Sequence, residues 1–445
     1  MTNYKLEDVF GTARKLPSSY IERAIDQKFL DSLEGEKHIV IYGSSKQGKT
    51  CLRKKYLKED EYITIVCSDK QRLSDLHEKI LREAGVEIVI KKSKTQKGEL
   101  NAGLESGINL GLTARAKGSL QAGFQNTRES EPFNIDIEDV NDIIRELQKV
   151  NFKKIILLED FHYLSLETQR DFANALKAYH ENSNLKFIVV GVWLDHNKLI
   201  TFNGDLAGRI ISINVDSWNF NYLRSLIEEG CRLLNIKFDE GLIDDIIDYS
   251  YDNVYFVQEM CYRICNQYKI RETLPDDAKS SNKSGYYDSN EDFIEEEDIL
   301  DNRFLIKIDD DFGRIVKEIV EQHSGRYNAF LHQFSNNNEA SKWIIYCLFK
   351  SNTSQLQDGL SIMNILDVIN NNLKGRNKAV AEREIIEVLE SVTQFQYKSS
   401  FKPAIVDYDH GIKRLSIVDK EFIIWLSFQS QETRLFYLNG SDFEL

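Results

Sequence analysis

Eight residues near the amino terminus combine glycine, lysine and threonine at a spacing that can hold phosphate. The segment Gly43–Thr50 reads GSSKQGKT and follows an apolar run that ends at Tyr42. Glycines permit a tight loop whose backbone N–H groups point at an anion, and Lys49 and Thr50 can reach phosphate and Mg²⁺. Because the segment follows a strand-like run and opens a helix-like one, it indicates a nucleotide phosphate-binding loop rather than a turn without a ligand.

A pair of carboxylates follows a second apolar run. Residues 155–158 are Ile-Ile-Leu-Leu, and Glu159 and Asp160 come directly after them. One carboxylate can hold Mg²⁺, and the other can orient or deprotonate an attacking water. An ordinary strand that leaves a core would look similar, but the upstream loop favours a site for ATP and Mg²⁺. We therefore expect Thr50, Glu159 and Asp160 to be the metal ligands, and Asp160, Glu159 and Lys49 to be catalytic.

These residues need a sheet that brings strand ends to one edge. Short β-branched runs at 39–42, 63–66, 155–158, 187–192 and 210–215 alternate with helical patterns at 49–57, 73–84, 137–150 and 168–180. Such alternation predicts an α/β fold, a parallel sheet with helices on both faces, over residues 37–216.

The rest of the chain predicts separate helical units. Residues 217–270 contain two helical stretches, and residues 271–311 are rich in acids, serine and asparagine, which predicts an exposed linker. Helical patterns at 341–350, 361–373 and 380–392 precede two strands around a turn, where we expect Gly411 to take a positive φ. This order predicts a winged helix over 312–430, followed by a tail at 431–445.

The motifs resemble P-loop ATPases of the AAA+ superfamily and the related signal-transduction ATPases (STAND), especially members with a helical lid and a winged helix, such as the origin-recognition ATPases. The resemblance spans roughly residues 18–430. It implies a five-stranded core with an extra strand between the phosphate-loop strand and the acidic strand. Three features depart from the usual pattern: Glu159 precedes Asp160, no clear asparagine or threonine sensor stands at the end of the run at 187–192, and the Gly-x-Pro of many STAND lids is missing from residues 250–260.

The resemblance also assigns residues to the nucleotide. Adenine would lie between the lid and a segment of the amino-terminal arm, residues 1–36. Arg209 would complete the γ-phosphate site of its own subunit or of a neighbour; a surface arginine before an edge strand is the alternative. The expected nucleotide-binding residues are Gly43, Ser44, Ser45, Lys46, Gln47, Gly48, Lys49, Thr50, Cys51, Tyr20, Ile21 and Arg23.

An insertion at 91–133 has an unusual alternation. Even-numbered positions from Leu100 to Phe124 are mostly apolar, whereas odd-numbered positions are mostly polar or glycine. Period two predicts a β-hairpin with one apolar face, which is marginal in water unless it packs on something. Its own domain, a second copy or partner protein, and a membrane are the candidate surfaces, and a disordered loop is a further alternative.

Composition restricts the partners. The formal charge is −14, and Asp407 and Asp409 occupy the expected wing tip, so nucleic acid is not favoured. The six scattered cysteines, the eight histidines without metal-ligand spacing, and the lack of a signal peptide or an apolar run of ~18 residues predict a reduced, cytoplasmic protein without structural zinc or a transmembrane segment.

The sequence therefore predicts an ATP-dependent switch. Nucleotide state would control self-association or engagement of a partner protein, with slow hydrolysis resetting the switch; a role in stress or antiviral defence is an analogy. Two alternatives are open. One is a DNA-binding ATPase of the origin-recognition or transposition-helper type, and the other is a nucleotide-binding scaffold with little turnover.

Overall fold

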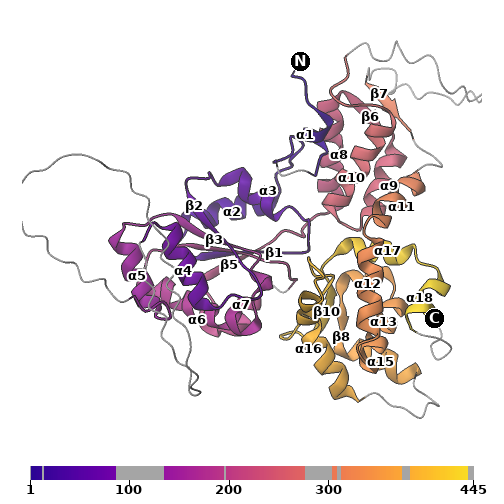
Figure 1. Cartoon of the computed structure of the whole chain (residues 1–445). Coiled ribbons are helices and arrows are strands. Elements are labelled where there is room, and N and C mark those ends of the chain that lie inside the picture. The colour runs from indigo at the N-terminus through magenta and orange to yellow at the C-terminus, as the bar shows by residue number, and fades with distance from the viewer. Residues whose placement is uncertain are drawn as a thin grey trace, which may run out of the picture.

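The computed structural model describes residues 2–12, 15–86, 135–194, 197–275, 303–307, 312–372 and 381–438 of the chain. The predicted hairpin at 91–133 lies outside these ranges. The described residues form an α/β core, a helical lid and a C-terminal domain (Figure 1). No helix in these ranges is both long and apolar enough to cross a membrane.

The core is built on one parallel sheet, as the alternating pattern predicts. Its strands are β1 (His38–Tyr42), β2 (Tyr62–Val66), β3 (Ile155–Glu159), β4 (Phe187–Val190) and β5 (Ile210–Asn214). The strand order is β2-β3-β4-β1-β5. Strand β4 lies between the phosphate-loop strand and the acidic strand, which confirms the expected insertion of a strand there.

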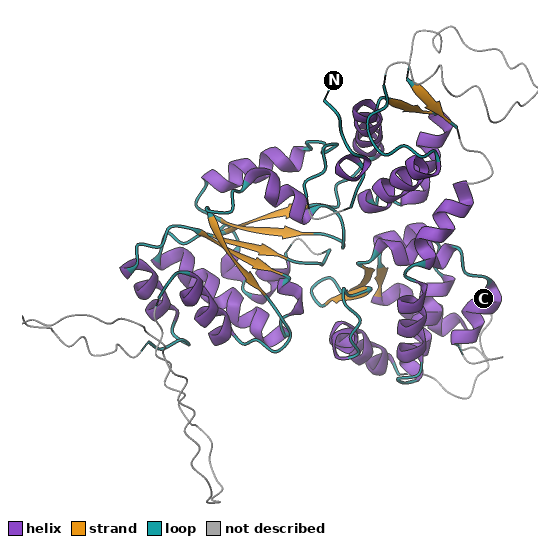
Figure 2. Ribbon diagram, turned by 45° about the horizontal axis from the view of Figure 1, so that its top comes forward, coloured by secondary structure: helices purple, strands orange, loops and turns teal. Residues whose placement is uncertain are grey.

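Helices cover both faces of this sheet (Figures 1 and 2). Phe29 and Leu52, from α2 (Ala24–Glu34) and α3 (Lys49–Tyr56), pack on one face. The other face packs against α4 (Leu73–Glu83), α5 (Val140–Lys149) and α6 (Leu166–Asn182). Three short helices complete the core: η1 (Phe161–Tyr163), α7 (Lys198–Phe202) and η2 (Gly204–Leu206). Burial of apolar side chains on both faces explains why the strands are continuous hydrophobic runs.

The lid contains α8 (Phe220–Leu234), α9 (Glu240–Ser250) and α10 (Val254–Gln267). Tyr251 and Asp252 have φ of 50° and 59°, so the second predicted stretch divides into α9 and α10 there. The amino-terminal α1 (Leu6–Val9) packs on the lid. Strand β6 (Ile236–Phe238) pairs with β7 (Phe304–Ile306), so the expected linker at 271–311 contains a strand of the lid.

The C-terminal domain shares one apolar cluster with the lid. It follows α11 (Phe312–Glu321), and its elements are α12 (Ser324–Ser335), α13 (Glu339–Lys350), α14 (Thr353–Asp358), β8 (Leu360–Ser361), α15 (Ile362–Asn372), α16 (Glu382–Lys398), β9 (Val406–Asp409), β10 (Arg414–Ile417), α17 (Lys420–Ser427) and α18 (Gln431–Tyr437). Apart from the short α14 between α13 and β8, the run α13-α14-β8-α15-α16-β9-β10 has the element order expected of a winged helix, with the sheet order β8-β10-β9.

Three local expectations in this domain need correction. The hairpin turn puts Lys413 rather than Gly411 in the left-handed region, with φ of 52°. The Gly411 N–H is instead bonded to Asp409 Oδ1 at 2.7 Å, so a side-chain turn replaces the expected glycine conformation. Helix α16 continues six residues beyond the predicted end at Val392, because Val392 and Gln396 remain buried. The expected tail at 431–445 begins with α18.

Candidate nucleotide-binding site

The phosphate loop has the backbone conformation that its glycines permit. Gly43 and Gly48 have φ of 140° and 89°, and Gly48 is the N-cap of α3. A Cβ atom at Gly43 would lie 2.7 Å from Val215 Cγ2 and 2.9 Å from Asp216 Oδ1. Any other residue at this position would therefore be strained and would clash with the chain that follows β5.

Lys49 lies inside the loop that it closes. Its Nζ donates to the Gly43 carbonyl at 3.0 Å and the Ser44 carbonyl at 2.5 Å. Burial lowers the pKa of Lys49 to about 8, although Asp216, Glu159 and Asp160 oppose this shift. A buried ammonium group whose hydrogen-bond acceptors are two main-chain carbonyls suits a site that receives phosphate oxygens.

We expect the protein to take up a proton at Lys49 when it binds nucleotide at alkaline pH. In the free protein Lys49 loses its proton above about pH 8, whereas phosphates favour the charged form and raise its pKa again. The affinity for ADP should therefore fall above pH 8, by at most about tenfold per pH unit. Calorimetry at pH 8.5 in two buffers of different ionisation enthalpy should show proton uptake. Equal heats in both buffers would contradict this assignment.

The two predicted carboxylates lie at the same sheet edge as the loop, but in different environments. Glu159 ends β3, and its Oε1 lies 3.0 Å from Nε of Arg53 on α3. Arg53 also donates to the Tyr62 hydroxyl at 2.8 Å. Asp160 follows with a left-handed φ of 58°. Burial raises the pKa of both carboxyls; Arg53 opposes the shift at Glu159, and Lys49 opposes it at Asp160.

A third carboxylate, Asp216, was not predicted from the sequence. Its Oδ2 accepts hydrogen bonds from the Ser44 N–H and the Ser44 hydroxyl, both at 2.8 Å. Asp216 lies two residues past the end of β5 and so fixes the start of the phosphate loop. Its place after a strand is the signal that could have identified it, because all the strands of a parallel sheet end at one edge.

A cavity of about 500 Å³ lies between the phosphate loop, the amino-terminal arm and the lid. Tyr20, Ile21 and Arg23 line it from the arm, and the predicted residues 46–51 line it from the loop. The Arg23 guanidinium lies 3.8 Å from the centroid of the Trp218 ring, and Trp218 Nε1 donates to the Gln47 carbonyl at 3.4 Å. The cavity is large enough for a nucleotide, with an aromatic and cationic wall on the arm side.

Arg209 lies away from this cavity. It precedes β5, and its carbonyl accepts from the His38 N–H, where β1 begins. The phosphate loop follows the other end of β1, roughly 16 Å away for a strand of this length. Arg209 also pairs with Glu181 at 2.7 Å. The placement is incompatible with a role at its own γ-phosphate, and a role toward a neighbouring subunit stays a prediction.

The side-chain oxygens of this site are suitable ligands for a Mg²⁺ ion bound to a nucleotide. Thr50 lines the cavity, and the charges of Glu159 and Asp160 both act on the pKa of Lys49. Hydroxyl and carboxylate oxygens are the ligands that Mg²⁺ prefers. Glu159 is paired with Arg53, so it would have to exchange the guanidinium for the metal before it could serve as a ligand.

The C-terminal domain contacts the phosphate loop directly. The Ser45 N–H donates to the Val418 carbonyl at 2.9 Å. Lys46 Nζ lies 2.8 Å from Glu421 Oε1, a side chain that is only 2% exposed. The same ammonium lies 3.9 Å from the centroid of the Tyr255 ring on α10. Adjacent residues of the loop thus join the core to the lid and to the C-terminal domain.

Several charged groups surround Glu421 at the buried end of this contact. Burial and Asp419 raise the pKa of Glu421 above its usual range, and Lys46 opposes the shift. Glu421 Oε2 also lies 3.1 Å from His323 Nε2. Burial disfavours the charge on Lys46, but Glu421 outweighs it and raises the pKa of the amine. We call the contacts of Ser45 and Lys46 with Val418 and Glu421 the loop latch.

Comparison with known proteins agrees with this architecture. Residues 32–196 match the AAA domain family. The loop, the sheet order and this match define a P-loop ATPase fold of the AAA+ type. No curated protein sequence matches the chain.

Three solved structures are similar over nearly the whole chain. The Walker-type ATPase PABY2304 of Pyrococcus abyssi is 14% identical with a TM-score of 0.49, and the match covers 94% of this chain and 100% of that one. The Aeropyrum pernix ORC1 protein, solved in complex with DNA, is 11% identical over 97% and 98% of the two chains, with a TM-score of 0.40. Cdc6p from Pyrobaculum aerophilum is 11% identical over 95% and 98%, with a TM-score of 0.37.

Proposed function

We propose that this protein is an ATP-dependent switch in which the loop latch reports the state of the nucleotide. The observation that carries the proposal is the pair of contacts from Ser45 and Lys46 to Val418 and Glu421. Phosphate oxygens, the Val418 carbonyl and the Glu421 carboxylate are all acceptors for donors of the same short loop. Adding a γ-phosphate therefore weakens the latch, whereas ADP leaves it closed.

Hydrolysis would reset the switch. ATP would lie in the cavity beside residues 46–51, with Mg²⁺ held by Thr50 and supplying charge stabilisation there. Lys49 would bind the phosphates. The Asp160 carboxylate would orient the attacking water and accept its proton. Before hydrolysis, in the ATP state, release of the C-terminal domain would expose surface for a second copy of the chain or for a partner protein.

Light scattering tests this proposal through the mass of the protein in solution. With ADP we expect the 51.7 kDa monomer, and with a non-hydrolysable ATP analogue a larger mass. Glu421→Gln weakens the latch, because the Lys46 ammonium then donates to a neutral amide oxygen instead of to a buried carboxylate. It should increase the mass even with ADP. Glu321→Gln is the matched control, since Glu321 pairs with Lys317 on an exposed face. The four samples are the unaltered protein with ADP, the unaltered protein with the ATP analogue, Glu421→Gln with ADP and Glu321→Gln with ADP. Equal masses for all four would contradict the switch.

The ion pair between Arg53 and Glu159 favours a second candidate, a nucleotide-binding scaffold with little turnover. Arg53 Nε lies 3.0 Å from Glu159 Oε1. The carboxylate that the first residue of the acidic pair would offer to the metal is therefore already paired with a guanidinium. A scaffold would bind ATP and change mass, but would release phosphate no faster than the Asp160→Asn variant described below.

The structure gives less support to binding of DNA by the C-terminal domain. Helix α16, the third helix of the winged-helix order, carries four exposed glutamates, Glu382, Glu384, Glu387 and Glu390. Near its other end, the Tyr397 ring lies 5.0 Å from the Tyr163 ring of the core. The wing residue Asp407 pairs with Lys198 of the core at 3.3 Å. Both elements would have to leave the core and overcome their own negative charge before they could contact phosphates.

A further inference from the structure

The cavity between the phosphate loop, the amino-terminal arm and the lid has charged residues of one sign only in its lining. Among the described residues no aspartate or glutamate lines it, whereas five cationic side chains do: Lys15, Arg23, Lys46, Lys49 and Lys54. The chain as a whole has a formal charge of −14. Cations gathered in one hollow of an acidic protein raise the local concentration of anions, so this cavity selects for negatively charged ligands.

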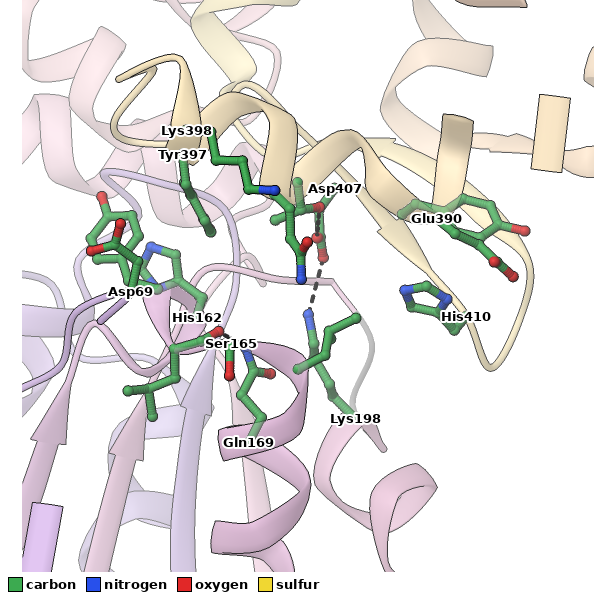
Figure 3. A pocket seen from close by; sticks show the side chains of 16 residues that line it. Asp69, His162, Ser165, Gln169, Lys198, Glu390, Tyr397, Lys398, Asp407 and His410 are labelled. Carbon is green, nitrogen blue, oxygen red and sulfur yellow. Dashed lines mark hydrogen bonds and ion pairs between the residues drawn. The ribbon is translucent and has the colours of Figure 1, made fainter. Parts of the chain in front are cut away.

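Another cavity, of about 300 Å³ between the core and the C-terminal domain, has a different lining (Figure 3). It mixes the two signs of charge, because Lys198 and Lys398 line it together with Asp69, Glu390 and Asp407. Lys198 and Asp407 pair with each other at 3.3 Å. An anion would meet both signs there, whereas the cavity beside the phosphate loop offers it only positive charge.

Three of the five cations already have a place in the candidate nucleotide site. Lys49 is the ammonium inside the loop, and Lys46 pairs with Glu421 in the loop latch. The Arg23 guanidinium lies 3.8 Å from the centroid of the Trp218 ring. A chain of 5′ phosphates in the loop accounts for at most these three, and two lysines lie outside the loop.

These two lysines come from different elements. Lys54 is four residues after Thr50 on α3, so the two side chains share one face of the helix, about 6 Å apart along its axis. Lys15 belongs to the amino-terminal arm, which also contributes Tyr20 and Ile21 to the lining. The sugar is the part of a nucleotide that follows its 5′ phosphates. The two ammonium groups are therefore placed to flank the sugar of a nucleotide whose phosphates lie in the loop.

The carboxylates of the arm compensate these charges poorly. Asp8 lies 3.9 Å from Lys15, in a pair whose side chains are 44% and 85% exposed, and exposed pairs of this kind contribute little. Glu22 pairs instead with Lys55, at 3.4 Å. A phosphate dianion between two ammonium groups has a charge product about four times that of one such pair, so it would displace Asp8 from Lys15.

We propose that this cavity prefers a nucleotide with an additional phosphate on its ribose, and that Lys15 and Lys54 bind this phosphate. A phosphate monoester carries a charge of about −2 near neutral pH, which matches two ammonium groups. The inference rests on the proposed nucleotide site and narrows its class of ligand. With a 5′-diphosphate, such a ligand competes with ATP for the loop and, under the proposed switch, keeps the latch closed.

Calorimetry of the full chain measures this preference with two ligands that differ by one phosphate, ADP and adenosine 3′-phosphate 5′-diphosphate. We expect the second ligand to bind about tenfold more tightly at about 0.1 M salt. The gain should shrink at about 1 M salt, because the Debye length falls from about 10 Å to about 3 Å. The isomer with a 2′-phosphate shows which ribose hydroxyl carries the additional group.

Variants locate the additional phosphate through the ratio of the affinities for the two ligands. The double variant Lys15→Gln, Lys54→Gln should reduce this ratio from about ten to about one. Lys58→Gln is the matched control and should leave the ratio unchanged, because Lys58 is an exposed lysine just past α3 that does not line the cavity. An unchanged ratio in the double variant would overturn the proposal.

The same titrations separate this inference from the proposed function. If ADP binds and neither isomer binds more tightly, the preference for a ribose phosphate is wrong and the nucleotide site stands. If none of the three ligands binds, both are wrong. Lys49→Ala should abolish binding of all three, because the loop holds the 5′-diphosphate that they share. An isomer that still bound to this variant would lie outside the cavity and would contradict the inference.

Discussion

Lys49→Ala should abolish nucleotide binding. The ammonium is the buried charge at the centre of the phosphate loop, and its Nζ donates to the carbonyls of Gly43 and Ser44. Charge-assisted hydrogen bonds to phosphate contribute about 1.5–3 kcal/mol each, so the loss of two or more lowers the affinity for ATP and ADP by more than about 100-fold. Calorimetric titration of both nucleotides measures the loss.

The folded protein should tolerate this change. Burial disfavours the Lys49 charge in the free protein, as its lowered pKa shows, so removing it costs little stability. Lys58→Ala is the matched control, because Lys58 is an exposed lysine just past α3. Normal ATP affinity in Lys49→Ala, at an unchanged melting temperature, would show that the loop is not the nucleotide site.

Asp160→Asn should retain nucleotide binding and lose hydrolysis. The carboxylate is the proposed acceptor of the water proton, and removing such a group typically slows turnover by about 10²–10⁴-fold. Asparagine is preferred to alanine here because Asp160 has a φ of 58°, a conformation that asparagine tolerates and alanine does not. Phosphate release under saturating ATP gives the rate, and calorimetry confirms binding.

The matched control for this variant is an exposed carboxylate of the same domain. Asp171→Asn changes an exposed carboxylate on α6 and should leave turnover unchanged. If Asp160→Asn released phosphate at the rate of the unaltered protein, Asp160 would have no role in hydrolysis. If the unaltered protein were already as slow as Asp160→Asn, the scaffold would be favoured over the switch.

The sequence was sufficient to predict the core because its signals are local. The central strands β1, β3 and β4 are short apolar runs with buried side chains on both faces, and the loop after β1 carries its own glycine and lysine pattern. The position of β4 beside β1 came from the resemblance, since strand order depends on contacts between distant segments. The break between α9 and α10 was missed because neither Tyr251 nor Asp252 is a glycine or proline.

The site residues show which functional inferences a sequence supports. Arg209 precedes a strand that is parallel to β1 and therefore lies at the edge opposite the phosphate loop, whereas Asp216 follows the same strand and lies beside the loop. Reasoning from strand direction would have distinguished the two. The partners of Ser45 and Lys46 could not be predicted, because Val418 and Glu421 are more than 350 positions away and are brought there by docking of whole domains.

Carbodiimide cross-linking tests most directly whether the nucleotide controls docking of the C-terminal domain, because it joins a lysine and a carboxylate only at ion-pair distance. The pairs Lys46–Glu421 and Lys402–Asp69 span the interface at 2.8 Å and 3.8 Å, and Lys177–Asp205 lies within the core at 2.6 Å. Mass spectrometry should find both interface cross-links with ADP, and fewer with a non-hydrolysable ATP analogue, at a constant yield of the core cross-link. Equal yields of the interface cross-links with both nucleotides would contradict the switch.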